Sequence, residues 1–359
     1  MNIIRDALVE SGVRHLFSTP SKKIDRIVEE ICSGSLVQLV SCISESNAID
    51  SCLSYHLVSG KVSAVLIDSE FIPADFLNKV EKSKSLESKV IFIFVGPVDK
   101  YFGKAIEESG LILKVSDITQ SVNFNLQSGP RIVLFSSKKA KLPHNSADLS
   151  LEISVPESVG RGEQESDISL DGLRFALYLI DELLTHSPDS IVIPDAGSAR
   201  KIVLSKLSKS NYVTTSGLTA MGWSLKALRG INLGSPDRLP IVVIGDGSLL
   251  LCASELALLA NSRTSCVVIL LINGQLGNRA EDTFIGKSSK LPKVDWQMFV
   301  EALGAQYVPI KSWPRRDFAE RLLRKTQDEL QPVVVPVDIS LETAYIYTWK
   351  SGLSVLDQA

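Results

Sequence analysis

Two apolar runs in the second half of the sequence each end on a polar side chain, and this pattern limits the folds open to the chain. Ile241–Ile244 is followed by Gly-Asp-Gly-Ser, and Cys266–Ile272 is followed by Asn273. Short runs rich in β-branched residues are typical of strands buried on both faces of a parallel sheet. A helical segment from about Leu249 to Ala260 separates the two runs. A strand–helix–strand unit predicts neighbouring parallel strands, so we expect Asp246 and Asn273 at the same edge of one sheet.

The same alternation of short apolar runs and helical segments occupies most of the chain. The other expected elements are helices over Asn2–Gly12, Lys22–Cys32 and Leu170–Leu184, and strands over His15–Phe17, Ala64–Ile67, Val90–Val95, Ile132–Phe135 and Ile191–Ile193. Between them, residues 138–167 hold scattered serine, proline and acidic residues with little periodicity, which is typical of a linker. We therefore predict an α/β protein of two doubly wound parallel-sheet domains, residues 1–140 and 168–359, with a polar linker over residues 141–167.

The composition argues against several classes of protein. A net charge of −3 disfavours a nucleic-acid binder, which needs a surplus of Lys and Arg. No apolar run approaches the ~20 residues of a membrane span, and the first residues, MNIIRDALVESG, lack the pattern of a signal peptide. The five cysteines show no Cys-x-x-Cys spacing and lie mostly in apolar stretches. We expect free, buried thiols and a cytoplasmic protein that binds neither nucleic acid nor membrane.

The expected sheet edge has the oxygen atoms that suit a divalent cation carrying a diphosphate. The helix is expected to begin just after Gly247 and Ser248, which points its free N–H groups and the positive end of its dipole at the same crevice. Mg²⁺ takes few protein oxygens and completes its octahedron with phosphate oxygens and water. However, Asp-Gly is also a common turn dipeptide and Ser248 a common helix cap, so these residues alone leave a plain turn and cap open.

Further residues at fixed spacing extend the pattern. The stretch TTSGLTAMGW precedes Gly-Asp-Gly-Ser, with Met221 lying 25 positions before Asp246 and Asn273 lying 27 positions after it. This spaced set resembles the diphosphate-binding half of thiamine-diphosphate (ThDP) enzymes of the 2-oxoacid decarboxylase and acetolactate synthase superfamily. The resemblance implies that Asp246 and Asn273 ligate Mg²⁺ through their side chains and Gln275 through its carbonyl oxygen.

The resemblance also implies contacts with the organic part of the cofactor. The residues concerned are Gly197, Ser198, Thr219, Met221, Asp246, Gly247, Ser248 and Asn273. Backbone N–H groups of Gly247 and Ser248 would bind the diphosphate, and Gly197 and Ser198 belong to an earlier loop that is a candidate for the same contact. Met221 would lie beneath the cofactor, although a core methionine is the alternative. The Thr219 carbonyl would accept a hydrogen bond from the amino group of the cofactor.

A stretch of the first half, SCISESNAIDSCLSYHLVSGK, resembles the family segment in which Asn-Glu-Gly-Asn-Ala leads into a helix. Glu45 matches the glutamate of that segment. The resemblance implies that its carboxyl group binds N1′ of the aminopyrimidine and favours the imino tautomer, whose nitrogen removes the proton from C2 of the thiazolium. Without this context, Glu45 would be an ordinary acidic residue that complements a helix dipole.

Two features, LFSTPSKKIDRIVEEI near the start and the expected lack of a middle domain, resemble the phosphonopyruvate and sulfopyruvate decarboxylases. Residues 1–140 would then be the pyrimidine-binding (PYR) domain and residues 168–359 the diphosphate-binding (PP) domain. The resemblance implies ThDP- and Mg²⁺-dependent decarboxylation of a small 2-oxoacid to an aldehyde. It also implies a homodimer or higher homo-oligomer with active sites at the subunit interface.

Three loops depart from the family pattern, at Ser18–Lys22, Asp68–Ala74 and Gly277–Asp282. All three would face the substrate, so the identity of the substrate is the weakest part of the resemblance. The candidate substrate contacts are Thr19, Ser21, Lys22, Asp68 and Arg279. The two cations among them could pair with a phosphonate, sulfonate or carboxylate tail, but solvated surface positions suit them equally well.

Two other functions stay open at this stage. One is a carboligase, such as an acyloin- or acetolactate-type synthase, which shares its first steps with a decarboxylase. The other is a non-catalytic regulatory protein that keeps the ThDP fold, which the altered loops favour. A plain dinucleotide-binding protein is disfavoured, because no Gly-x-Gly-x-x-Gly follows the first strand of either half.

Overall fold

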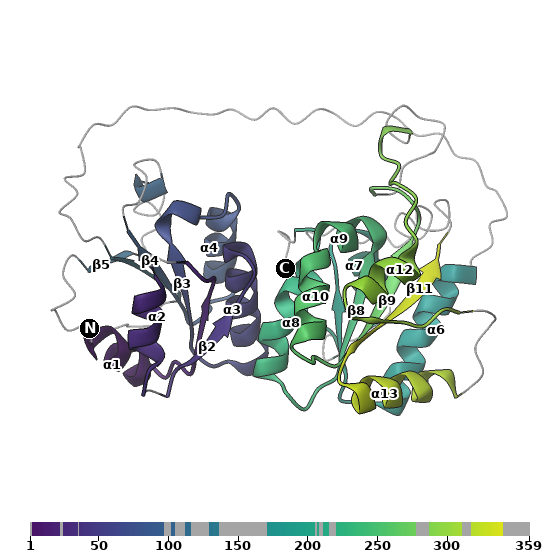
Figure 1. Cartoon of the computed structure of the whole chain (residues 1–359), viewed down its shortest axis with the longest axis horizontal. Coiled ribbons are helices and arrows are strands. Elements are labelled where there is room, and N and C mark those ends of the chain that lie inside the picture. The colour runs from purple at the N-terminus through teal and green to yellow at the C-terminus, as the bar shows by residue number, and fades with distance from the viewer. Residues whose placement is uncertain are drawn as a thin grey trace.

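The computed structural model of the chain contains two parallel-sheet α/β halves that lie side by side (Figure 1). The residues that it describes are 2–21, 24–34, 36–96, 102–104, 112–115, 129–135, 171–204, 207, 211–214, 220–277, 287–310 and 317–339. The expected linker over residues 141–167 lies outside these ranges. The predicted domain boundaries therefore stay predictions.

The first half is built on a six-stranded parallel sheet in the order β2-β1-β3-β4-β6-β5. Its strands are β1 (His15–Ser18), β2 (Gln38–Ser41), β3 (Ser63–Asp68), β4 (Val90–Val95), β5 (Ile112–Val115) and β6 (Arg131–Phe135). Its helices are α1 (Asn2–Glu10), α2 (Asp25–Cys32), α3 (Glu45–Ser59) and α4 (Phe76–Ser85), with a short 3-10 helix η1 (Ser69–Phe71). The strand order reverses direction between β1 and β3, which is the hallmark of a doubly wound sheet.

The second half is built on a five-stranded parallel sheet in the order β10-β11-β9-β8-β7. Its strands are β7 (Ile191–Pro194), β8 (Pro240–Gly245), β9 (Cys266–Ile272), β10 (Gln306–Tyr307) and β11 (Pro332–Asp338). Its helices are α6 (Asp171–His186), α7 (Ser198–Leu204), α8 (Trp223–Gly234), α9 (Asp246–Leu251), α10 (Ala253–Asn261), α12 (Trp296–Ala302) and α13 (Phe318–Glu329). The predicted α/β fold with two parallel sheets is confirmed.

Helices cover both faces of each sheet. Successive residues of a strand point to opposite faces, so each strand contributes apolar side chains to two clusters. In β4, Ile91 and Ile93 join the apolar cluster beneath α1 and α2, whereas Phe92 and Phe94 pack against Phe76 of α4. In the second half, one cluster lies against α6 and α13 and the other against α8 and α10. Burial on both faces explains why these strands are continuous apolar runs.

The structure corrects the expected helix after β8. That helix begins at Asp246 rather than after Ser248, because Gly245 is extended (φ −81°, ψ 156°) and the chain turns into the helix at the next residue. The expected segment from Leu249 to Ala260 is also two helices, α9 and α10, which meet at Cys252. Two smaller corrections concern the first half, where α1 ends at Glu10 and α2 begins only at Asp25.

Two expectations from composition can be compared with the structure. Within the ranges given above, no helix is long and apolar enough to cross a membrane. All five cysteines are free, and all except Cys32 are buried. Burial raises the pKa of the Cys42 thiol to about 12, so this thiol stays protonated and packs as a small apolar group.

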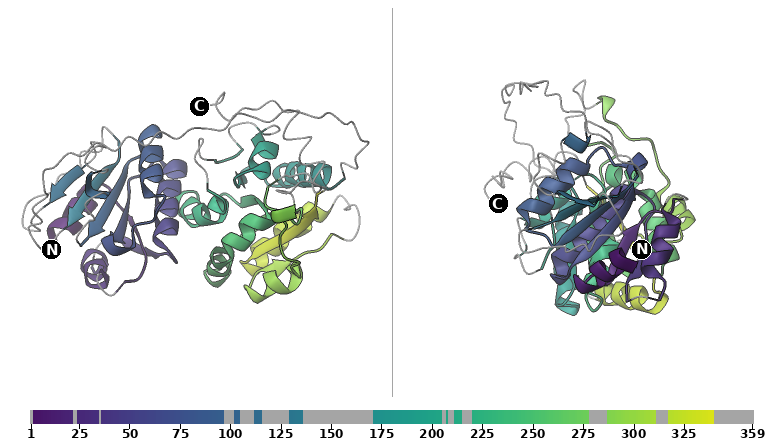
Figure 2. Two further views of the ribbon diagram at one scale, coloured as in Figure 1. Left: turned by 90° about the horizontal axis from the view of Figure 1, so that it is seen from above. Right: turned by 90° about the vertical axis from the view of Figure 1, so that its left-hand side faces the viewer.

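The two halves meet where α3 lies beside α8 (Figures 1 and 2). This is the most extensive contact between an element of one half and an element of the other. Because α3 begins at Glu45 and α8 follows Met221 closely, the contact brings together, within one chain, two segments that the resemblance expects to meet across a subunit interface.

Candidate functional site

The carboxyl ends of β8 and β9 are joined through the carboxylate of Asp246. These strands are neighbours, as the sequence predicts. Asp246 is 3% exposed, and its Oδ2 accepts hydrogen bonds from the backbone N–H groups of Asn273 (3.0 Å) and Gly274 (2.7 Å). Its Oδ1 accepts one from the N–H of Gly247 at 2.8 Å. The carboxylate is thereby fixed at the sheet edge between the two strand ends.

The electrostatics of Asp246 favour a cation in this place. Burial raises the pKa of its carboxyl group, and the hydrogen bonds from Gly274, Gly247 and Asn273 partly oppose that rise. Among the described residues, this buried carboxylate accepts hydrogen bonds only from neutral N–H groups and has no charge partner. A divalent cation would supply that partner and favour the ionised form.

Asn273 and Gln275 form the turn that follows β9. The Oδ1 atom of Asn273 accepts a hydrogen bond from the N–H of Gln275 at 3.0 Å, and its Nδ2 donates to the carbonyl of Gly277 at 3.3 Å. The side chain of Gln275 is buried and donates to Ser289 Oγ at 2.7 Å. The amide nitrogen of Gln275 is therefore engaged within the protein, and the resemblance implies that a contact to a metal would come from its backbone carbonyl.

Gly247 and Met221 lie next to each other at this edge. A Cβ atom at Gly247 would lie 2.6 Å from Cδ2 of Leu276 and 3.7 Å from Cε of Met221, so the ends of these two side chains lie over the Gly247 backbone. Met221 is 37% exposed and is not the core methionine of the alternative interpretation. Its thioether instead lies over the first turn of α9, beside the metal-ligand candidates.

The loop after β7 reaches the same edge, since β7 pairs with β8. Ser198 is the first residue of α7, and Gly197 precedes it with φ +83°. Asp195 in this loop is fully buried and accepts hydrogen bonds from the N–H groups of Gly222 (2.9 Å) and Ser224 (3.0 Å). This carboxylate holds the first turn of α8 in place, a role that the sequence analysis missed. Thr219 lies outside the described residues.

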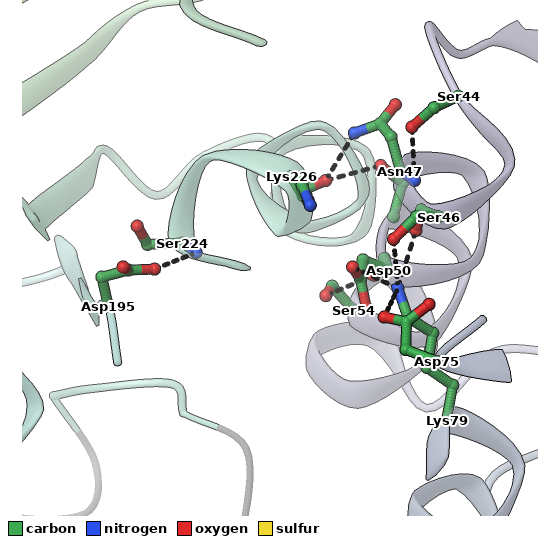
Figure 3. Close-up of polar contacts among 11 residues, drawn as sticks. Ser44, Ser46, Asn47, Asp50, Ser54, Asp75, Lys79, Asp195, Ser224 and Lys226 are labelled. Atoms are coloured by element: carbon green, nitrogen blue, oxygen red, sulfur yellow. Dashed lines mark hydrogen bonds and ion pairs between the residues drawn. The ribbon is translucent and has the colours of Figure 1, made fainter. Parts of the chain in front are cut away.

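Glu45 is the first residue of α3, and its helix packs on the second half. Ser44 caps the helix by accepting a hydrogen bond from the N–H of Asn47. The side chain of Asn47 then donates to the carbonyl of Lys226 in α8 (Figure 3), and the side chain of Ser51 donates to the same carbonyl. The structure thus places the Glu45 turn against the helix that follows Met221, within a single chain.

The candidate substrate residues of the first half lie at the ends of β1 and β3, where the strand order reverses. Ser21 Oγ donates to Asp68 Oδ2 at 2.9 Å, and Asp68 Oδ1 accepts from the N–H of Glu70 at 3.1 Å. The hydroxyl of Thr19 is buried, and no hydrogen bond to it is found among the described residues. The other two candidates, Lys22 and Arg279, lie outside those residues.

The oxygen atoms at the edge of the second sheet fit a hard cation that binds a diphosphate. Among the residues described, no cluster of three or more His, Cys, Asp or Glu side chains could hold a metal. A cation here would rely on the Asp246 carboxylate, on amide and carbonyl oxygens, and on phosphate oxygens of its ligand, which is the coordination Mg²⁺ prefers.

The second half of the chain is similar to a family of known cofactor-binding proteins. Residues 195–337 match the family model of the thiamine pyrophosphate enzyme C-terminal TPP-binding domain. The acetolactate synthase large subunit of Lactococcus lactis is 28% identical over 174 residues, which are 46% of this chain and 30% of that protein. The pyruvate decarboxylase of Neurospora crassa is 33% identical over 85 residues, which are 24% of this chain and 15% of that protein. The chain thus spans less than a third of the length of these curated relatives.

Solved structures resemble the whole chain in fold. A thiamine diphosphate-dependent 4-hydroxybenzoylformate decarboxylase from Rhodococcus jostii has a TM-score of 0.65 at 13% identity, covering 94% of this chain and 98% of that chain. Benzoylformate decarboxylase from Polynucleobacter necessarius has a TM-score of 0.67 at 11% identity, covering 95% and 98%. The match over residues 195–337 thus supports a thiamine pyrophosphate-binding domain in the second half, and these structural neighbours share the fold of the whole chain.

Proposed function

We propose that the chain is a ThDP- and Mg²⁺-dependent enzyme that decarboxylates a small 2-oxoacid to an aldehyde. The observation that carries this proposal is the meeting of Asp246, Asn273 and Met221 at one sheet edge, with the Glu45 helix packed on the adjoining α8. ThDP, when bound, supplies the electron sink that makes loss of CO₂ possible.

Each candidate site residue would have one role in binding the cofactor or in catalysis. Asp246 and Asn273, with the Gln275 carbonyl, would hold Mg²⁺, and the first turn of α9 would bind the diphosphate. Met221 would pack against the cofactor. Glu45 would hold a proton at N1′ of the aminopyrimidine and so favour the tautomer that acts as a base.

Within this reaction class, we propose a phosphonopyruvate- or sulfopyruvate-like substrate. Lys22 and Arg279 would pair with its anionic tail, and their support is their charge and their place in the two altered loops. Ser21, Asp68 and the buried hydroxyl of Thr19 would form the wall at the end of β1 and β3. We also propose a homodimer, which sedimentation of the purified protein at several concentrations would test.

A carboligase is the second candidate, and the matches to acetolactate synthases favour it. Both reactions begin by decarboxylation of a 2-oxoacid, and they differ in whether a proton or a second carbonyl compound is taken up. Analysis of the products with and without an added aldehyde or 2-oxoacid acceptor separates them. A larger, acyloin-type product that forms only with the acceptor would identify a carboligase.

The direct test is ThDP binding with Mg²⁺ and CO₂ release from a panel of 2-oxoacids that includes phosphonopyruvate, sulfopyruvate, pyruvate and benzoylformate. Glu45→Gln should bind the cofactor but release CO₂ at least ~100 times more slowly, a typical contribution of a proton-transfer group. Asp246→Asn should weaken ThDP–Mg²⁺ binding about 100-fold, since it removes a charged ligand.

The matched control is Glu29→Gln, a substitution of an exposed glutamate in α2. It should change neither cofactor binding nor CO₂ release. Absence of ThDP binding by the wild-type chain would refute the proposed function, and full activity of Glu45→Gln would refute the role of that residue.

A further inference from the structure

We propose that Asn47 and Ser51 of α3 are positioning residues that keep Glu45 in register with the second half of the chain. This inference rests on the proposed role of Glu45. Asn47 Nδ2 donates to the carbonyl oxygen of Lys226 in α8 at 3.1 Å (Figure 3). Ser51 Oγ donates to the same oxygen at 2.8 Å. Two side chains one helical turn apart thus converge on one atom of the other half.

These two hydrogen bonds specify one alignment of the helices. Lys226 lies inside α8, so its carbonyl is not one of the unpaired groups at a helix end that any neighbour would satisfy. Asn47 is 1% exposed and Ser51 is 0% exposed. Sliding α3 along α8 would leave both buried donors without an acceptor, which is costly in a protein interior.

Asn47 acts on Glu45 through the first turn of α3. Its backbone N–H donates to Ser44 Oγ at 3.2 Å, which fixes the start of the helix, while its side chain reaches α8. Glu45 lies between Ser44 and Asn47 in the first turn of α3. The backbone of Glu45 is therefore held both within α3 and across the interface.

Hydrogen bonds also hold the start of α8, the helix of the second half that contacts α3. Asp195 accepts hydrogen bonds from Gly222 and Ser224, directly after Met221 and two residues before Lys226. The first turn of α8 is thus tied to the loop after β7. The start of α8 is bonded to the loop after β7 through Gly222 and Ser224, and to α3 through the carbonyl of Lys226.

Two glycines of α8 allow such short side chains to cross the interface. A Cβ atom at Gly230 would lie 1.8 Å from the carbonyl oxygen of Ser51, and one at Gly234 would lie 2.4 Å from Cγ2 of Val58. The backbones of the two helices therefore approach closely, and the side chains of Asn47 and Ser51 can reach a backbone atom of the opposite helix.

The experiment compares Asn47→Ala, Ser51→Ala and the double variant with Ser54→Ala. Ser54 is a matched control, because it is a buried serine of the same helix whose hydroxyl donates to Asp50 O within α3. Amide hydrogen exchange is measured on the cofactor-free protein. kcat and the Kd for ThDP with Mg²⁺ are then measured on the same samples.

In the double variant, amides of residues 45–59 and 223–234 should exchange about tenfold faster, since two interfacial hydrogen bonds are lost. kcat should fall by up to ~100-fold, the cost of a misplacement of about 1 Å in a catalytic group. The Kd for ThDP with Mg²⁺ should stay close to that of the wild type, because the proposed ligands all lie in the second half. Ser54→Ala should leave exchange across the interface and kcat unchanged.

Unchanged exchange in the double variant would overturn the register role. Faster exchange with an unchanged kcat would overturn the positioning of Glu45. A loss of kcat in Ser54→Ala as large as in Ser51→Ala would show a general packing effect and overturn the inference as well. If the wild-type chain binds no ThDP, the proposed function and the positioning role fall together, while the exchange data still decide whether Asn47 and Ser51 align the helices.

Discussion

Glu255 shows how a single buried acid of the interface responds to pH. It lies in α10 and is 4% exposed. Burial raises the pKa of its carboxyl group from 4.5 to about 7, with Asp50 of the first half adding to the rise and Lys226 and Arg229 opposing it. Between these two pH values, the folded chain holds a proton that the unfolded chain has released.

The sign of the pH dependence follows from this difference. The unfolded chain binds fewer protons in this range, so the contribution of Glu255 to the free energy of unfolding falls as the pH rises from about 4.5 to about 7. The fall is of the order of 3 kcal/mol at most, at about 1.4 kcal/mol per pKa unit. Glu255→Gln should remove this slope and be more stabilising, relative to the wild type, at pH ~8 than at pH ~5.

Urea unfolding of both proteins across this pH range measures the effect. Glu301→Gln is the control, because it replaces an exposed glutamate of α12 and should leave the pH dependence unchanged. Parallel curves for the wild type and Glu255→Gln would contradict the prediction.

At the scale of elements, the packing of α3 on α8 depends on Gly230. A Cβ atom at this position would meet only backbone atoms, at 1.8 Å from O and 2.7 Å from C of Ser51 and 2.9 Å from N of Tyr55. Backbone atoms of a buried helix cannot rotate away as a side-chain end can, so Gly230→Ala must push the helices apart. We expect a loss of about 1–3 kcal/mol in the free energy of unfolding, typical of overpacking.

Gly103→Ala is the matched control for this prediction, since no described residue would lie within 4 Å of a Cβ atom there. It should be neutral or stabilise the chain by up to about 1 kcal/mol, through the lower entropy of the unfolded state. Thermal unfolding of the three proteins makes the comparison. Equal stability of the two glycine variants would show that α3 and α8 can separate at no cost.

Strands buried on both faces were predictable from the sequence, whereas one-sided and interrupted strands were not. Runs such as Val90–Val95 and Cys266–Ile272 became β4 and β9, because burial on both faces leaves an unbroken apolar signal. β2 is an edge strand in which only Val40 is buried, so it lacks that signal. β11 contains Pro336, which is tolerated because the neighbouring β10 pairs only with Val333 and Val334.

Only part of the candidate site could likewise be predicted from the sequence. The convergence of Asp246 and Asn273 followed from the topology of one strand–helix–strand unit, which is local in sequence. The hydrogen bonds from Asn47 and Ser51 to Lys226 join residues 179 and 175 positions apart. No periodicity in one sequence reports such a contact. The only local trace of the interface is the Gly230-x-x-x-Gly234 spacing, which permits close helix packing without naming the partner helix.

For the whole molecule, the proposed cofactor ligands and the proposed catalytic acid lie in different halves, and this asymmetry predicts how the chain responds to ligands. Asp246, Asn273 and Met221 belong to the second half and Glu45 to the first. ThDP with Mg²⁺ at about 100 times its Kd should add ~2.7 kcal/mol to the free energy of unfolding, or roughly 4 °C in Tm for a chain of 359 residues. Amide exchange should slow most in β8 and β9, next to the ligands, and less in the strands of the first half.

Calorimetry with and without a chelator tests this prediction. Removing the metal with EDTA should abolish the rise in Tm, because Asp246 can hold an anionic diphosphate only through a cation. Asp246→Asn should show no rise even with Mg²⁺ present, whereas Glu45→Gln, which leaves the second half intact, should keep most of it. A rise that survives EDTA would mean that the diphosphate binds without a metal bridge. Loss of the rise in Glu45→Gln would mean that the first half contributes to cofactor affinity as strongly as the second.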